Sequence, residues 1–174
     1  MSVHQGVLSG TVNALGQFWQ SQSIPMCPQA VGDVVATAQH RGLVLPPDFI
    51  HFYSATNGLN SPSVLGTDSN GFLLLPLEEL RTEQRKMLVV ADGSAVEKTV
   101  SITIFADYLQ ASWWYGLIAE IGSVNYQIGI MPVESECKVF TTSLADFLRL
   151  YIADDEILYD WGHPFSELGR SCPK

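Results

Sequence analysis

The chain has 174 residues, of which 47% are hydrophobic and 16% are charged, a composition that is typical of one globular domain and excludes a disordered protein. Nine lysine and arginine residues against 18 aspartate and glutamate residues give a formal net charge of −9. This charge argues against binding to nucleic acid, which is itself a polyanion. It is expected either to serve solubility alone or to favour a basic protein partner.

No apolar run reaches the length needed to span a bilayer, and the first residues lack the basic and apolar regions of a signal peptide. We therefore expect a cytoplasmic protein that makes no contact with a membrane. The three cysteines are scattered and match neither a disulfide framework nor a zinc site, which predicts free thiols. They are Cys27, Cys137 and Cys172.

Sequence motifs that carry catalysis are missing: there is no phosphate-binding loop, no HExxH zinc motif and no GxSxG nucleophile elbow. The four histidines are isolated from the cysteine and carboxylate spacings of metal sites. A triad assembled from distant residues stays open at this point, but nothing favours any one combination. We predict a protein that is not an enzyme and that uses neither a cofactor nor a metal.

Two helices are predicted in the first part of the chain. Residues 5–20 form the first, and we assign it to an N-terminal helical extension, residues 1–25. The second runs from Pro28 to about His40, and Gly42 suits the left-handed position just past its end. The apolar stripe of the first helix consists of Leu8, Val12, Leu15 and Trp19.

A third helix is predicted within the stretch from Leu45 to Leu59. Pro46-Pro47 suit the first turn of a helix, where a missing N–H leaves no partner unsatisfied, and Asp48 suits the positive helix N-terminus. Asn57-Gly58 tolerate positive φ and so end the helix. The residues on its apolar face are Phe49, Phe52 and Tyr53.

The segment Thr67–Gly71 resembles a calcium-binding loop only superficially, because it lacks the twelve-residue ligand pattern and its terminal glutamate. We interpret it as a turn before a strand at residues 72–75. After Pro76, a helix is predicted from Leu77 to about Val90, with a polar, solvent-facing middle.

The second half changes from helical spacing to alternation, and it ends in a helix that begins at Ser143 and a tail, residues 154–174, that we expect to pack on the core. Short connections between successive strands indicate an antiparallel meander, and helices grouped against such a sheet give an α+β fold in a single domain. The predicted strands cover residues 100–105, 113–119, 126–131 and 138–141.

Several motifs, in order, resemble those of the SUKH superfamily, the group of the yeast cell-wall synthesis regulator and many bacterial immunity proteins. The first is Leu-Pro-x-Asp-Phe at residues 45–49, followed by Asn57-Gly58. The resemblance covers a core of roughly residues 26–153 and implies the SUKH fold. One departure is Tyr108-Leu109-Gln110-Ala111, which is more apolar than the glycine-rich turn of the family. The later matching motifs occupy residues 71–80, 104–107, 112–117 and 143–148.

The resemblance implies a non-enzymatic immunity protein that binds and neutralises a cognate toxin, such as a nuclease with a basic cleft. Within Trp113-Trp114-Tyr115, neighbouring side chains of a strand point to opposite faces, so either Trp114 enters the core or the two flanking rings do. We place the partner surface on the outward face of this strand. Its candidate residues are Asp107, Trp113, Tyr115, Glu120, Asp154, Asp155 and Glu156.

Two other functions stay open. A regulatory scaffold, which the yeast member suggests, predicts several weaker partners. A small-ligand-binding domain predicts a pocket between the sheet and the helices, together with a rise in thermal stability on ligand binding. Exposed aromatic rings serve self-association equally well, so a homodimer is a further alternative.

Overall fold

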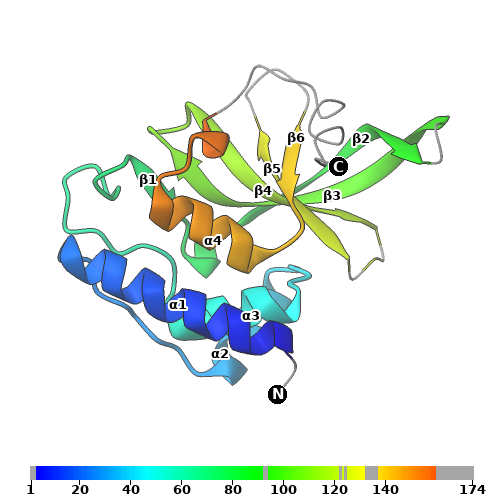
Figure 1. Ribbon diagram of the computed structural model, residues 1–174. Coiled ribbons are helices and arrows are strands. Elements are labelled where there is room, and N and C mark those ends of the chain that lie inside the picture. The colour runs from blue at the N-terminus through cyan, green and yellow to red at the C-terminus, as the bar shows by residue number, and fades with distance from the viewer. Residues whose placement is uncertain (1–2, 92–93, 122, 124, 132–136, 160–174) are drawn as a thin grey trace.

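Six antiparallel strands of the described chain form one sheet, and the helices gather on one side of it (Figure 1). This computed structural model describes residues 3–91, 94–121, 123, 125–131 and 137–159. The predicted α+β fold with an antiparallel sheet is confirmed. The helices are α1 (Val3–Ser21), α2 (Val31–His40), α3 (Pro47–Ala55) and α4 (Leu144–Ala153), with the 3-10 turns η1 (Leu77–Glu79) and η2 (Glu156–Leu158). The strands are β1 (Phe72–Leu74), β2 (Arg81–Ala91), β3 (Ser94–Tyr108), β4 (Trp113–Glu120), β5 (Tyr126–Met131) and β6 (Lys138–Thr141).

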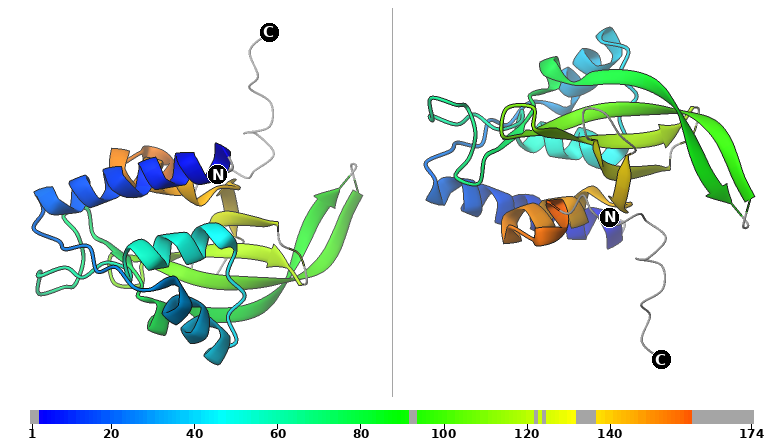
Figure 2. Two further views of the ribbon diagram at one scale, coloured as in Figure 1. Left: turned by 90° about the horizontal axis from the view of Figure 1, so that it is seen from below. Right: turned by 90° about the horizontal axis from the view of Figure 1, so that it is seen from above.

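The long strand β3 organises the sheet. Its first part pairs with β2 as far as Arg81 opposite Ile104, and its last three residues pair with β1. β1 and β2 therefore share one edge of β3, while β4, β5 and β6 follow on the other side. Because β4 ends at Glu120, opposite Val100, the β2–β3 hairpin extends past β4 and projects from the body (Figure 2).

The helix predicted over residues 77–90 is wrong, because only η1 is helical and Arg81 begins β2. The polar run 81–86 is rich in residues that favour helices in isolation. Each of its residues nevertheless pairs with β3, and Thr82 stands opposite Thr103. Pairing with β3 therefore outweighs the local helix preference of this segment, and the segment forms a strand.

The remaining predicted elements are present with shifted ends. α2 begins at Val31 rather than at Pro28, and β3 begins at Ser94 rather than at Val100. Helix α4 begins after Ser143, whose hydroxyl accepts a hydrogen bond from the amide of Asp146 (3.3 Å) and so caps the helix.

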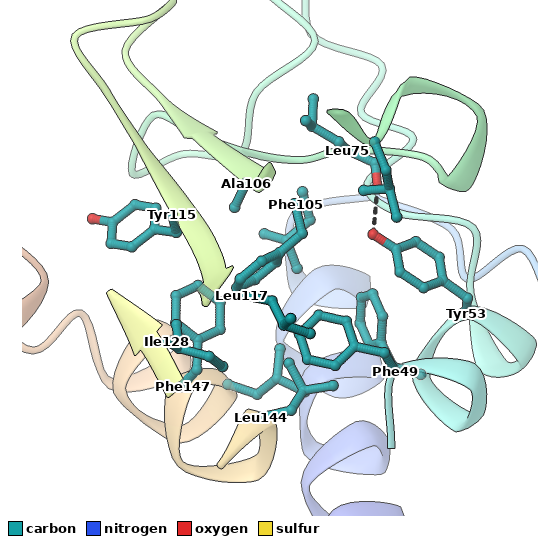
Figure 3. Close-up of a cluster of buried hydrophobic side chains, with 14 of the residues drawn as sticks. Phe49, Tyr53, Leu75, Phe105, Ala106, Tyr115, Leu117, Ile128, Leu144 and Phe147 are labelled. Carbon is teal, nitrogen blue, oxygen red and sulfur yellow. Dashed lines mark hydrogen bonds between the residues drawn. The ribbon is translucent and has the colours of Figure 1, made fainter. Parts of the chain in front are cut away.

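The core lies between the sheet and the helices (Figure 3). Rings of Phe49 in α3, Phe105 in β3 and Phe147 in α4 meet edge to face, with neighbouring centroids 5.2 and 5.0 Å apart. The stripe predicted for the first helix is buried, and Trp19 is fully so. The segment assigned as an extension, residues 1–25, thus supplies part of this core through the packing of α1 on α4.

A buried chain of hydrogen bonds joins α1, α4 and the turn before β1. Trp19 Nε1 donates to Tyr151 Oη (2.8 Å), and Tyr151 Oη donates to Asp68 Oδ2 (2.5 Å). The other carboxylate oxygen, Asp68 Oδ1, accepts from the amides of Asn70 (2.9 Å) and Phe72 (2.8 Å). The segment that superficially resembles a calcium loop is therefore the predicted turn, and its carboxylate is occupied by protein donors.

Helix α3 ends at Ala55 with the extended cap residue Thr56, earlier than the predicted stop at Asn57-Gly58, and these two residues instead tie the helical layer to the sheet. Asn57 Oδ1 accepts a hydrogen bond from the first amide of η1 (2.8 Å), and Tyr53 Oη donates to the Leu75 carbonyl (3.0 Å; Figure 3). Gly58 has a φ of +72°, and a Cβ there would lie 2.6 Å from the Leu74 carbonyl oxygen. Glycine is required at this position by both conformation and space.

Replacing Gly58 with alanine should destabilise the fold by about 3 kcal/mol or more, because a left-handed penalty of about 1–2 kcal/mol adds to a backbone clash. Gly42→Ala is the matched control, since Gly42 has a φ of +67° but a Cβ added there would have nothing within 4 Å. It should lower stability by only about 1–2 kcal/mol. Urea denaturation measures both values, and equal losses would show that the backbone contact is unimportant.

Stability should fall as the pH rises above about 10, the ordinary pKa of tyrosine. Burial raises the pKa of Tyr53 above that value, so the unfolded chain loses the phenolic proton first and ionisation favours unfolding. Tyr53→Phe should lower stability at neutral pH by about 1 kcal/mol, the net contribution of one hydrogen bond. It should also reduce the alkaline slope by up to about 1.4 kcal/mol per pH unit. Urea denaturation across this pH range checks both effects, and an unchanged slope would contradict the assignment.

Candidate functional site

The structure brings most of the predicted contact residues together at one end of the sheet. There, β3 ends, β4 begins, and the chain leaves α4 through η2. Tyr108 and Trp113 stack with centroids 4.4 Å apart, and the ring of Tyr159 meets Tyr108 at 5.2 Å. We call this surface the acid–aromatic end. It consists of Tyr108, Leu109, Trp113, Asp154, Asp155, Glu156 and Tyr159, with Asp107 at its margin, on the face of the sheet that carries Trp114.

Tyr115 does not belong to this surface, and its prediction as a contact residue is corrected. The side chain is fully buried, and its hydroxyl accepts from Trp113 Nε1 (2.9 Å) and donates to the Leu158 carbonyl (2.7 Å). Of the two alternatives for the run Trp113-Trp114-Tyr115, the structure shows the second: Trp113 and Tyr115 turn toward the helices, and Trp114 lies on the opposite face of the sheet. η2 decides this, because it covers that face, whereas Trp114 on the other face lies 5.4 Å from the Arg81 guanidinium.

Glu120 is also separated from the other candidates. It lies at the far end of β4, seven residues from Trp113, which corresponds to about 23 Å along a strand. Its carboxylate pairs with Lys98 Nζ at 2.6 Å. The sequence could place both residues on one strand, but it could not indicate that the two ends of that strand lie in different surroundings.

Three carboxylates of the acid–aromatic end hold local structure. Asp107 Oδ1 accepts from the amide of Ala111 (2.7 Å), and Asp155 Oδ1 accepts from that of Ile157 (3.0 Å). Asp154 ends α4 in the left-handed conformation and accepts the hydroxyl hydrogen of Tyr159. These bonds fix the positions of the charges at the surface.

The charge of this end is not neutralised within the described chain. No lysine or arginine among the described residues forms an ion pair with Asp107, Asp154, Asp155 or Glu156. The last turn of α4, the negative end of the helix dipole, has no basic residue. Burial raises the pKa of Tyr108, and the charges of Asp154 and Asp68 add to this effect.

The turn between β3 and β4 presents an apolar side chain beside these charges. Leu109, Gln110 and Ala111 have φ values of 47°, 56° and 70°, so three successive non-glycine residues are left-handed. This conformation is unfavourable by about 1–2 kcal/mol per residue. Leu109 is 53% exposed, and its amide donates to the Gly71 carbonyl (2.9 Å). The sequence signal for this feature is the apolar turn where the resembled family has glycines.

Comparisons with known proteins found no matching family model, curated protein or solved structure. Among the residues that the structure describes, no helix is long and apolar enough to cross a membrane. The same part of the chain holds no group of three or more histidine, cysteine, aspartate or glutamate side chains arranged to bind a metal ion. The predicted tail beyond Tyr159 and the third cysteine, Cys172, lie outside the described residues.

Gln110→Gly should stabilise the protein by up to about 1 kcal/mol, because glycine adopts the positive φ of this position without a steric penalty. Gln17→Gly is the control, since this exposed residue lies inside α1, where glycine should instead destabilise by about 0.5–1 kcal/mol. Thermal denaturation shows whether each substitution raises or lowers the stability of the protein. A loss of stability in Gln110→Gly would contradict the strain argument.

Proposed function

We propose that this protein is a non-enzymatic immunity protein whose acid–aromatic end binds a basic protein toxin and thereby neutralises it. The observation that carries the proposal is a group of carboxylates that form no ion pair with any described residue, beside the exposed Leu109 and the half-buried Trp113. Support for the toxin as the partner comes from the SUKH-like motifs of the sequence. A nuclease with a basic cleft fits best, since acidic side chains occupy such a cleft in place of nucleic acid.

Each component of the surface has a distinct role in this proposal. The unpaired charges steer a basic partner toward the acid–aromatic end and raise its association rate. Leu109 supplies an apolar contact that loses its water on binding, beside the half-buried ring of Trp113. Because hydrogen bonds already hold Asp107 and Asp155 in place, little side-chain freedom remains to be lost on association.

The second candidate is a regulatory scaffold with several weaker partners. An acidic surface with an apolar anchor serves either function, so the partner decides between them. Growth rescue in the presence of one toxin supports immunity, whereas several weak complexes without rescue support the scaffold.

The test is co-expression with the product of the adjacent open reading frame, with growth and co-purification scored across a salt series. Glu156→Lys should slow association by about tenfold at low salt, and the effect should shrink as salt screens the charges. Glu79→Lys is the matched control, because Glu79 is also exposed and also lies in a 3-10 turn, on the side of α2. It should leave binding nearly unchanged.

Leu109→Ser should weaken the complex by about tenfold or more at every salt concentration, because it removes apolar contact rather than charge. Surface plasmon resonance separates the two effects into association and dissociation rates. A tight complex that tolerates both Glu156→Lys and Leu109→Ser would place the toxin elsewhere. Absence of both rescue and complex with the folded protein would refute this pairing.

A further inference from the structure

A second site lies at the opposite end of β4 from Trp113. A cavity of about 450 Å³ opens between the sheet and the connection from α2 to α3. Its floor comes from β2, β3 and β4, and Tyr126 of β5 also lines it. This volume falls within the range of small-molecule sites, about 300–1,000 Å³.

The floor is polar where the rest of the helix-facing side of the sheet is apolar. Thr82 and Thr103 stand opposite each other, with their hydroxyl oxygens 3.0 Å apart, and the next pair on this face is Gln84 opposite Ser101. Within the described chain, neither Gln84 nor Ser101 uses its side chain in a hydrogen bond. These donors and acceptors are therefore available to a ligand.

The wall and rim of the cavity are apolar. Val44 and Ile121, on the rim, are 84% and 59% exposed. Leu45 and Pro46 continue the wall on the side of the α2–α3 connection. A ligand that fits these surroundings presents hydrogen-bonding groups to the strands and an apolar face to the connection.

The cavity is nearly neutral, although the chain as a whole carries a formal charge of −9. Among the described residues that line it, Glu120 is the one with a formal charge, and Lys98 neutralises it at 2.6 Å. There is thus no cation here to offset the desolvation of an anionic group. The chemistry of the lining selects an uncharged ligand.

We propose that this cavity binds an uncharged small molecule that carries hydroxyl or amide groups along one side and an apolar face on the other. A neutral sugar and a nucleoside share this chemistry. The site is independent of the acid–aromatic end and of the partner proposed for it.

The test is a titration of the full-length, ¹⁵N-labelled protein with maltose and, separately, with thymidine, followed by NMR. At least one probe should shift the amide signals of Ser101, Thr103 and Ala119 in a saturable way at millimolar concentrations. Thymidine 5′-monophosphate should bind about tenfold more weakly than thymidine, because its phosphate finds no cation. A response to maltose alone identifies a sugar site, and a response to thymidine alone identifies a nucleoside site.

Ser101→Ala should weaken binding of the active probe by about five- to tenfold, as expected for one lost neutral hydrogen bond. Thr99→Ala is the matched control, since Thr99 lies on the same strand but does not line the cavity. Leu109→Ser should leave probe binding unchanged, which separates this proposal from the toxin-binding one. The proposal is overturned if neither probe shifts these signals, if the phosphate binds as well as thymidine, or if Ser101→Ala and Thr99→Ala behave alike.

Discussion

The close passage of Gly58 against the chain that leaves β1 fixes how the helices sit on the sheet. Asn57 and Tyr53 add hydrogen bonds to the same segment, so three contacts from one helix end hold the start of η1 and the end of β1. β1 in turn pairs with the last residues of β3, which lead into the left-handed turn. The position of the acid–aromatic end therefore depends on the close contact between the backbone of Gly58, a residue without a side chain, and the backbone at the end of β1.

Local patterns revealed the elements whose structure is set locally. Caps and helical spacing located α1, α3 and α4, and alternation located the strands of the second half. β2 could not be found this way, because its polar residues 81–86 favour a helix until β3 is present to pair with them. The site shows the same limit: alternation puts Trp113 and Tyr115 on one face, but only η2, far along the chain, determines that this face is covered.

The acidic residues by themselves have a sufficient structural explanation. Asp107 holds a turn, Asp154 ends a helix and Asp155 caps η2, and short polar side chains are common in these roles. The turn at residues 109–111 beside them has no such structural explanation for its residue types. Glycine or asparagine at positions 109–111 would adopt the left-handed conformation with less strain, and neither would expose a leucine. This locally unfavourable choice, which exposes an apolar side chain, is the feature on which our proposal of a contact outside the chain rests.

One strand, β4, thus connects two surfaces of opposite character. Trp113 at its start lies beside carboxylates that have no ion-pair partner in the described part of the chain, whereas Ala119 near its end lines a neutral cavity. The two ends are separated by about 20 Å of paired strand, and independent sites at such a distance usually have additive effects. Coupling between them would require an element with two arrangements, and the continuous pairing of β4 with β3 and β5 disfavours one. A ligand in the cavity therefore has no structural route by which to alter binding at the acid–aromatic end, unless the twist of the whole sheet changes.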